Sequence, residues 1–385
     1  MKVLYLTDSL SDLDGVGRYA MRLIAELELA QPGMQVEVLL SRKHRPTSDQ
    51  VPKHWRVRVA LPPDYFFYMP PVRFKIWYLI GLWNSWRAAR RADIVHAIKD
   101  FPHNMVAVDA ARLAGKPCIA TAHGTYTIQP LLTPRYAARA RKTYARFARM
   151  ITVSRYTLKQ LRNILGDKGL ENVQVVPNAV AAEHYRDVRD VGEQVWHTHP
   201  FTLGIGELKE RKGHHLALES WCRVAQDHQD LHHYIVGKQS GDEYERSLVK
   251  MAEDAGLGDR VHFLGNISED EKIDLLQRAE IFIHTPVTAA DGGFEGFGIV
   301  YLEASAAGTA TIGTRDSGAE DAIENGVSGL LVEPIVDEVE NALRRLLKDH
   351  SMRSLLGSGG RARALESTWK SNAQRVLKMY REVLA

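Results

Sequence analysis

Two glutamates at the start of a predicted helix have the chemistry to bind the hydroxyl groups of a sugar. Glu295 lies in a glycine-rich stretch between Gly292 and Gly298, and Glu303 follows within a helix predicted over residues 298–307. A carboxylate accepts two hydrogen bonds at once, which suits the vicinal hydroxyls of a sugar or a ribose. The alternative is a capping carboxylate followed by one surface glutamate.

A second segment combines cations with the start of another predicted helix. Arg211 and Lys212 follow a predicted strand and precede a helix expected to begin near His214. Because a helix N-terminus carries about +0.5 elementary charge, this pair could bind a diphosphate, although an isolated Arg-Lys pair also fits a solvated loop. A weaker signal, Asp14-Gly-Val-Gly17, opens a helix after the first strand, where a structural tight turn fits equally well.

A regular alternation of strands and helices must position these residues. Short β-branched runs alternate with amphipathic patterns along nearly the whole chain, which favours parallel sheets with helices on both faces. The predicted helices include residues 17–30, 134–149, 214–226 and 336–349. The predicted strands are residues 3–7, 35–40, 57–61, 94–97, 117–122, 150–153, 173–176, 202–206, 233–236, 261–264, 281–284, 310–313 and 330–332.

The alternation falls into two blocks, which predicts an α/β protein of two doubly wound, Rossmann-like domains. At 385 residues the chain exceeds what one hydrophobic core usually serves. A loop-like stretch at 181–200 separates the blocks, so we expect a first domain at 1–180 and a second at 181–369. Because ligands of such folds bind beyond the carboxyl ends of the strands, we expect the two domains to face a central cleft.

The stretch from Glu295 to Glu303, EGFGIVYLE, resembles the glutamate–seven–glutamate signature of retaining glycosyltransferase family 4. The resemblance covers most of the chain and implies the GT-B fold. It places the nucleotide sugar on the second domain and the acceptor mainly on the first, and the final helix, 370–385, back on the first domain. Further motifs recur in family order: GVGRY at 15–19, AHG at 122–124, VSR at 153–155, VPN at 176–178, RKG at 211–213, GVSGLLV at 326–332 and Trp369.

The resemblance also implies a role for each residue of the donor site. Lys212, with Arg211, would neutralise the diphosphate leaving group. Glu303 would bind the ribose hydroxyls and Glu295 the transferred sugar. The backbone of Phe297, Gly298 and Ile299 would bind sugar and phosphate, while His123 would touch the sugar near the reacting carbon and Gly15 would face the phosphates. Fixed cations and N–H groups suit a reaction in which charge develops on the leaving group.

The implied reaction is the transfer of a hexose, with retention of configuration and without a metal or other cofactor. The donor would be GDP-mannose, a UDP-hexose or UDP-GlcNAc, and the acceptor a lipid-linked or glycan molecule of the cell envelope. Two departures from the family pattern stand out: Glu207 replaces an expected arginine after Gly206, and Asp14 replaces one of a pair of glycines. They leave two alternatives open, a non-catalytic partner that binds nucleotide sugars and a nucleotide-sugar epimerase of the same architecture.

The charge of the chain is distributed unevenly. Residues 1–180 hold 27 Lys and Arg against 13 Asp and Glu, whereas residues 181–385 hold 23 against 34. Two stretches of the first half, 65–92 and 110–166, mix aromatic and basic residues, and the second has eleven cations and no acid. This pattern predicts docking on an anionic membrane surface, at the inner face of the plasma membrane. One basic stripe is predicted at helical spacing: Arg135, Arg139, Lys142, Arg146 and Arg149.

Other classes of function have less support. A nucleic-acid binder would leave the second half unexplained. The adjacent pairs His214-His215 and His232-His233 diverge on a helix or strand, and no ligand spacing accompanies them, so no metal site is predicted. Cys118 and Cys222 lie in apolar segments of different halves, which indicates free thiols and a cytoplasmic protein.

Overall fold

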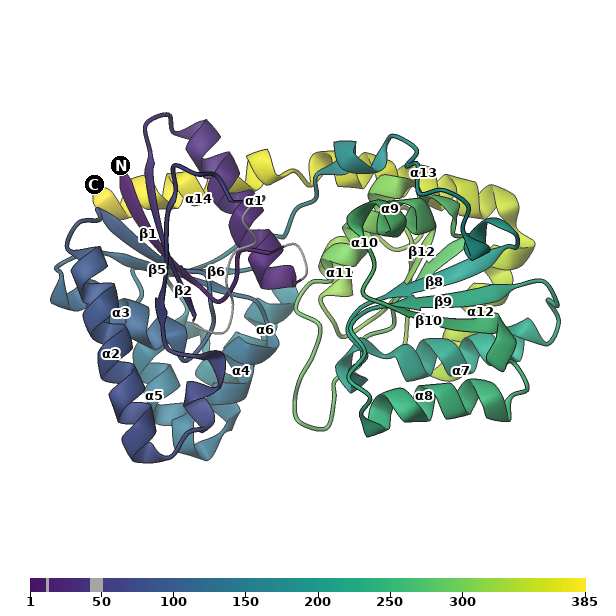
Figure 1. Cartoon of the computed structure of the whole chain (residues 1–385), viewed down its shortest axis with the longest axis horizontal. Helices are drawn as coiled ribbons and strands as arrows, with labels where there is room; N and C mark the ends of the chain where they lie inside the picture. Colours follow the sequence, from purple (N-terminus) through teal and green to yellow (C-terminus); the bar gives the residue numbers. More distant parts are fainter. Residues whose placement is uncertain (12–13, 42–50) are drawn as a thin grey trace. The chain divides into compact units, whose positions relative to one another are not determined.

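The computed structural model describes residues 1–11, 14–41 and 51–385, apart from the side chains of Tyr65 and Phe67. The chain forms two compact units (Figure 1). Unit 1 consists of Met1–Asn178 and Trp369–Ala385, and unit 2 of Ala179–Thr368. Within the described residues, none of the helices combines the length and the apolar character needed to cross a bilayer.

Unit 1 is built on a parallel sheet in the order β3-β2-β1-β4-β5-β6-β7. Because the order reverses between β1 and β4, this is a doubly wound sheet whose ligand site is expected beyond the carboxyl ends of those two strands. Every strand predicted in this half is confirmed to within a residue at its ends. The strands are β1 (Lys2–Thr7), β2 (Gln35–Ser41), β3 (Arg56–Leu61), β4 (Ile94–Ala97), β5 (Cys118–Ala122), β6 (Arg149–Thr152) and β7 (Val173–Val175).

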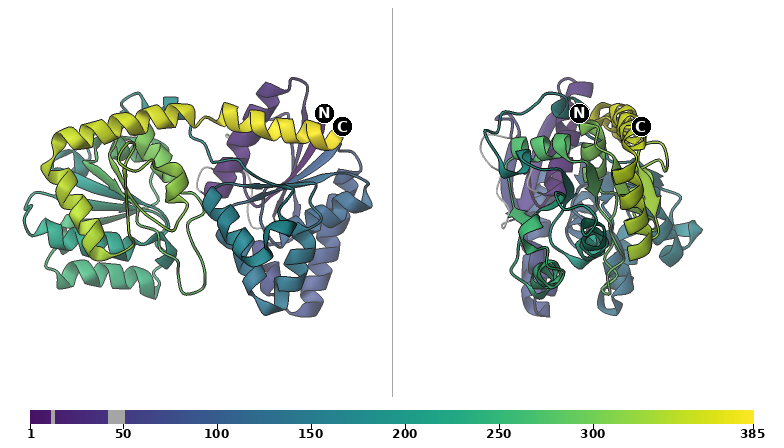
Figure 2. Two further views of the ribbon diagram at one scale, coloured as in Figure 1. Left: turned by 180° about the vertical axis from the view of Figure 1, so that it is seen from behind. Right: turned by 90° about the vertical axis from the view of Figure 1, so that its right-hand side faces the viewer.

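Helices pack on both faces of this sheet. The final helix, α14 (Trp369–Leu384), lies along α1 (Gly15–Ala30), as Figure 2 shows from behind. A buried network fixes it there, because the Tyr380 hydroxyl lies 2.6 Å from His96 Nδ1 on β4 and His96 Nε2 lies 2.8 Å from the Thr121 hydroxyl on β5. The other helices are α2 (Pro71–Ala89), α3 (His103–Leu113), α4 (Thr125–Leu132), α5 (Pro134–Tyr144) and α6 (Arg155–Leu165), with the 3₁₀ turns η1 (Asp64–Tyr68) and η2 (Asp167–Gly169).

One predicted helix is wrong at its C-terminal end. The pattern over 134–149 continues through a turn, but α5 ends at Tyr144 and Arg149 already belongs to β6. Phe147 holds this turn against the sheet. Its side chain is buried, and its backbone carbonyl accepts a hydrogen bond from Asn172 Nδ2 at 2.6 Å. Arg146 therefore lies beyond the helix, and the basic stripe on α5 is limited to its first three members.

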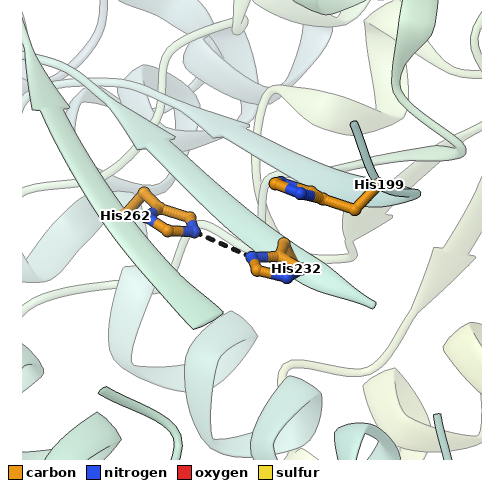
Figure 3. Close-up of side chains that lie close together, drawn as sticks. All are labelled: His199, His232 and His262. Carbon is orange, nitrogen blue, oxygen red and sulfur yellow. Dashed lines mark hydrogen bonds between the residues drawn. The ribbon is translucent and has the colours of Figure 1, made fainter. Parts of the chain in front are cut away.

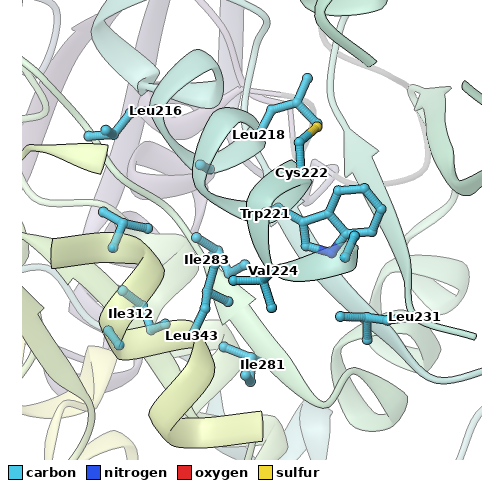
Figure 4. Packing of buried hydrophobic residues seen from close by; sticks show 14 of the residues in the cluster. Leu216, Leu218, Trp221, Cys222, Val224, Leu231, Ile281, Ile283, Ile312 and Leu343 are labelled. Atoms are coloured by element: carbon cyan, nitrogen blue, oxygen red, sulfur yellow. The ribbon is translucent and has the colours of Figure 1, made fainter. Parts of the chain in front are cut away.

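Unit 2 repeats the architecture with a parallel sheet in the order β10-β9-β8-β11-β12-β13, which reverses between β8 and β11. An apolar cluster of unit 2 packs β-strand residues such as Ile283 and Ile312 against Trp221 of α7 (His214–Ala225) and Leu343 of α12 (Val336–Lys348) (Figure 4). The six predicted strands are confirmed as β8 (Phe201–Ile205), β9 (His232–Val236), β10 (Val261–Gly265), β11 (Ile281–Ile283), β12 (Thr311–Thr314) and β13 (Leu330–Val332).

The helices of unit 2 again start near the carboxyl ends of strands. The helices predicted at 214–226 and 336–349 are confirmed, each one residue shorter than predicted. The full set is α7 (His214–Ala225), α8 (Glu243–Asp254), α9 (Glu269–Arg278), α10 (Ile299–Ala307), α11 (Ala319–Ala322), α12 (Val336–Lys348) and α13 (His350–Glu366). Short 3₁₀ turns are η3 (Ala182–Tyr185), η4 (Val195–His197), η5 (Glu210–Lys212) and η6 (Gly258–Arg260).

Candidate functional site

The loops that follow β8 and β11 are joined at the point where the strand order of unit 2 reverses. Gly213, at the end of the first loop, adopts φ +69°, and a Cβ there would lie 1.6 Å from the Thr285 carbonyl oxygen. The Thr285 hydroxyl donates to the Gly213 carbonyl at 2.8 Å. Only glycine allows so close an approach together with a left-handed backbone. The glycine therefore fixes Arg211 and Lys212 beside the loop that carries Glu295.

The joined loops bring the predicted cations and Glu295 into one buried cluster. Lys212 Nζ donates to Glu295 Oε2, and Arg211 Nη1 lies 3.8 Å from the same oxygen. The three side chains are only 16%, 19% and 10% exposed, in the order Lys212, Arg211 and Glu295. Burial alone would raise the pKa of Glu295, but Lys212, His284 and Arg211 hold it well below its ordinary value. The carboxylate is therefore ionised, and two cations surround one anion.

His284 belongs to this cluster although the sequence did not single it out. Its Nε2 lies 3.4 Å from Glu295 Oε2, and its carbonyl accepts from the Tyr301 hydroxyl at 2.6 Å, which ties α10 to the end of β11. Burial lowers the pKa of His284, so the imidazole is neutral and adds no third charge. A polar side chain directly after a strand next to the reversal point is the signal that could have identified it.

The segment Phe297–Ile299 supplies the start of α10. Gly298 adopts φ +79° as the residue before the helix, and a Cβ there would lie 2.7 Å from the ring of Tyr301. Gly318 packs directly against the loop that carries Glu295. Its N–H donates to the Glu295 carbonyl at 2.9 Å, and a Cβ on it would clash with Gly296. The first N–H groups of an α-helix have no carbonyl partner within the helix. The helix start thus offers donors to an anion, next to two cations.

Glu303 is held by a neighbouring helix. It is 2% exposed, and its Oε1 lies 3.3 Å from Nζ of Lys272 on α9, which is 6% exposed and also lies 2.8 Å from Glu269. A buried carboxylate of this kind needs a cation or hydrogen-bond donors. The sequence did not identify Lys272 as the partner, because the two residues stand on different helices.

Glu207, the departure from the family pattern, lies at the edge of the cluster. Its side chain is 46% exposed and pairs with Lys209 at 2.8 Å. Burial would raise its pKa, but the bond to Lys209 and the charges of Lys212 and Arg211 lower it. The Glu207 carboxylate therefore pairs with Lys209, while Arg211 and Lys212 pair with Glu295.

The corresponding point of unit 1 holds His123. The backbone carbonyl of Ile98 can only accept, so His123 Nε2 carries the proton of their 3.0 Å hydrogen bond. Burial lowers the pKa of His123 to about 4, which leaves the ring neutral with an acceptor at Nδ1. The ring packs edge-on against Tyr19 of α1, 4.9 Å between centroids. Gly15 is the first residue of α1 and is exposed, with open space around it.

Three further ionisable residues lie here that the sequence reasoning did not assign to the site. Lys99 donates to Asp8, and the Asp100 carboxyl accepts from Thr127 and, at 3.4 Å, from the His123 N–H. Burial raises the pKa of Asp100 to about 7, although Thr127 and Lys99 act in the opposite direction. Asp14, the other family departure, caps α1 by accepting from the Gly17 N–H at 2.6 Å.

The predicted basic stripe is partly preserved on the surface of unit 1. Arg135, Arg139 and Lys142 are exposed on α5, and among the described residues none of the three forms an ion pair. Arg146, in contrast, pairs with Asp109 at 2.8 Å and is 28% exposed. The guanidinium of Arg139 lies 5.3 Å from the ring of Phe74, which places α5 beside α2.

The neighbouring helix α2 carries an exposed apolar stripe. Val72, Ile76, Leu79 and Trp83 are 71%, 52%, 51% and 56% exposed, and their spacing places them on one face of the helix. Exposed apolar patches of this kind mark sites of interaction with proteins or membranes. The sequence predicted aromatic residues beside the cations here, but it did not distinguish the exposed face from the packed one.

Comparison with known families covers both units. The family described as Glycosyltransferase Family 4 matches residues 13–184, and the family described as Glycosyl transferases group 1 matches residues 191–363. Together the two matches leave only the ends of the chain and a short connecting segment uncovered.

Curated relatives include two types of bacterial enzyme. A D-inositol 3-phosphate glycosyltransferase of Corynebacterium urealyticum is 30% identical over 46% of this chain, which spans 42% of that relative. A GDP-mannose-dependent alpha-(1-6)-phosphatidylinositol monomannoside mannosyltransferase of Mycolicibacterium smegmatis is 27% identical over 70% of this chain and 71% of its own.

Solved structures show the same fold over the full length. Anabaena HepE in complex with UDP and glucose has a TM-score of 0.80 at 21% identity and covers 99% of this chain and 100% of its own. WaaG, a glycosyltransferase involved in lipopolysaccharide biosynthesis, has a TM-score of 0.72 at 16% identity, with 98% and 99% covered. At these identities the likeness concerns the fold: two Rossmann-like domains of the GT-B type.

Proposed function

The chain belongs to glycosyltransferase family 4, and on that premise we propose that it transfers a hexose from a nucleoside-diphosphate sugar to a lipid-linked acceptor, with retention of configuration. The observation that carries the proposal is the cluster of Lys212, Arg211 and Glu295 beside the N-terminus of α10. Two preorganised cations and a helix start suit the charge that develops on a departing diphosphate.

The proposed chemistry uses the groups of this chain in a balanced step. The bond between the anomeric carbon and the diphosphate oxygen breaks as the acceptor oxygen bonds to the same face of the sugar, and the acceptor proton passes to the departing phosphate. Lys212, Arg211 and the backbone at Phe297–Ile299 stabilise the diphosphate. Glu295 binds the sugar and Glu303 the ribose. The family resemblance assigns His123 to the sugar and Gly15 to the phosphates, and we carry both roles into the proposal.

The proposed donor is a GDP- or UDP-hexose. Support comes from relatives named as GDP-mannose-dependent and from HepE, which was crystallised with UDP-glucose. We propose that transfer needs no metal ion, because Lys212 and Arg211 supply the positive charge that a metal would otherwise bring to the phosphates. Activity unchanged by EDTA is the expected result, and a strict requirement for a divalent cation would contradict it.

We also propose that α2 and α5 dock unit 1 on the anionic inner face of the plasma membrane. The exposed stripe on α2 would enter the interface, and each of Arg135, Arg139 and Lys142 would contribute about 1 kcal/mol against anionic lipid. The relatives that act on phosphatidylinositol monomannosides support a glycolipid acceptor. The attraction would weaken with salt, because screening acts over about 8–10 Å.

Co-sedimentation with phosphatidylglycerol vesicles tests the docking. We expect binding at low salt that is lost when Arg135, Arg139 and Lys142 are changed to Glu, and weakened in Trp83→Ser. Leu355→Ser is the matched control, because Leu355 is 69% exposed on α13 of unit 2. Equal binding to neutral vesicles would show that α2 and α5 are not the membrane-binding surface. The same conclusion would follow if neither the three changes to Glu on α5 nor Trp83→Ser on α2 altered binding.

A screen of GDP- and UDP-sugars with lipid-linked acceptors, followed by NMR of the product anomer, tests the transfer itself. A product with the donor's configuration supports the proposal. Glu207 favours a second candidate, a non-catalytic partner that binds nucleotide sugars, because it replaces an expected cation. That candidate predicts nucleotide binding without turnover for any acceptor, and an epimerase would instead convert the donor without an acceptor.

A further inference from the structure

Three histidines of unit 2 meet at the N-terminal ends of its strands. The loops that carry Lys212 and Glu295 lie at the opposite, C-terminal ends. His199 precedes β8, His232 is the first residue of β9, and His262 is the second residue of β10. In the parallel register, His232 lies opposite Phe201, and His262 lies opposite Tyr234. Because side chains alternate along a strand, the three imidazoles project from the same face of three neighbouring strands (Figure 3). Lys212 and Glu295 follow the other ends of β8 and β11.

The imidazoles are close enough to share one ion. Each can offer a nitrogen such that the three nitrogens lie within 4.8 Å of one another. His232 Nδ1 lies 2.9 Å from His262 Nε2, and the ring of His199 stacks on that of His232 with 3.6 Å between centroids. Nitrogen ligands about 2.0–2.1 Å from a tetrahedral zinc ion require separations of this order. Because the rings of His199 and His232 are stacked in nearly parallel planes, the ring of His199 must turn for its nitrogen to meet the ion.

The protonation of the cluster suits a ligand set. Burial lowers the pKa of His199 and of His262. It lowers the pKa of His232 to about 4, with further contributions from the other two rings and from Arg260, while Asp230 acts in the opposite direction. Neutral imidazoles keep a lone pair for a metal at pH 7. His199 Nδ1 lies 3.0 Å from the Thr198 hydroxyl and its Nε2 lies 2.6 Å from the Tyr234 hydroxyl, so the ion takes the place of one of these contacts and the other orients the ring.

We propose that His199, His232 and His262 form a binding site for a divalent transition metal, with zinc as the natural occupant and water completing its coordination. Imidazole ligands favour zinc, nickel and copper over magnesium and calcium, which prefer oxygen. The ion ties the starts of β8, β9 and β10 together, so its role is structural. This inference is independent of the proposed transfer, because it concerns the other edge of the sheet.

The experiment titrates tag-free protein with ZnCl₂ by calorimetry and follows thermal unfolding. We expect one zinc ion per chain and a raised unfolding temperature, with no effect of MgCl₂. Each of His199→Gln, His232→Gln and His262→Gln should weaken zinc binding at least about tenfold. His350→Gln should leave it unchanged, because His350 is an exposed histidine at the start of α13.

A second readout guards against variants that fail to fold. Cobalt(II) added to the unaltered protein should give the visible absorption bands of a nitrogen-ligated ion, and zinc should displace them. Nucleotide binding should persist in the three variants, which separates loss of the metal site from loss of the fold. The proposal is overturned if cobalt gives no such bands, or if His199→Gln and His262→Gln bind zinc as tightly as the unaltered protein.

Discussion

Each unit carries a buried lysine–carboxylate pair at the point where its strand order reverses, yet the two pairs have different surroundings. Lys99 and Asp8 in unit 1 are 17% and 10% exposed, and Lys212 and Glu295 in unit 2 are 16% and 10% exposed. Arg211 adds a second cation beside Glu295. In unit 1, burial would lower the pKa of Lys99, but Asp8 and Asp64 raise it to about 12, and the nearby His123 is neutral.

The comparison shows that the same topology can give an anion site or a site for neutral groups. In unit 2 the cations outnumber the carboxylates and stand at helix starts, which suits the diphosphate of the proposed donor. In unit 1 the single lysine is already neutralised, and a neutral imidazole and a carboxyl with a raised pKa suit hydroxyl groups. This difference is the physical reason for assigning the donor to unit 2 and the acceptor to unit 1.

The largest expected effect comes from Lys212→Ala. Removing a preorganised charge stabiliser typically costs roughly 2.7–4 kcal/mol, so the rate of transfer should fall about a hundredfold or more. Lys209→Ala is the matched control, because Lys209 stands in the same loop but is 50% exposed and pairs with Glu207. Steady-state kinetics of both variants, with thermal unfolding to verify the fold, make the measurement. Equal rates for the two variants would remove Lys212 from the site.

Glu295→Gln should separate the roles within the cluster. The change removes the carboxylate proposed to bind the sugar but leaves Lys212 and Arg211, so nucleoside diphosphate affinity should be kept or increased while transfer falls about a hundredfold. Calorimetry with the diphosphate and kinetics with the nucleotide sugar provide the two readouts. Transfer at the unaltered rate would refute the role given to this carboxylate.

How far the sequence predicted this site depends on whether its residues are close along the chain. The glycine-rich motif holds Glu295 and Glu303, and the loop between β8 and α7 holds Arg211 and Lys212, so local spacing was enough. Lys272 lies on α9, while His284 and Asp100 lie in the loops after β11 and β4, and only the packing brings them to their partners. The strands were predicted to within a residue or so because both sheets are buried and their strands are continuous apolar runs.

A smaller effect is expected from Arg211→Ala. If Arg211 supplies the second cation that position 207 no longer provides, its loss should weaken nucleoside diphosphate binding by about tenfold, as expected for one hydrogen bond to a charged group. The reverse change, Glu207→Arg, should strengthen binding. Calorimetry on both variants measures this, and an unchanged affinity for Arg211→Ala would favour the non-catalytic candidate.

In unit 1 the smallest effect is a pH dependence of stability. The pKa of Asp100 rises from its ordinary 3.8 to about 7 on folding, so its contribution to stability is present at low pH and is lost as the pH rises toward 7. Asp100→Asn cannot ionise. The difference in unfolding temperature between this variant and the unaltered protein should therefore grow from pH 4.5 to pH 7.5. A constant difference would mean that Asp100 is ionised throughout.

The most direct test compares the two buried lysines as ligands of the diphosphate. Lys212→Met and Lys99→Met each remove one charge of nearly equal exposure and keep most of the apolar stem. Calorimetric titration with UDP and with GDP should show a large loss of affinity in Lys212→Met and almost none in Lys99→Met. Equal losses in the two variants, or a loss confined to Lys99→Met, would contradict the assignment of the donor diphosphate to unit 2.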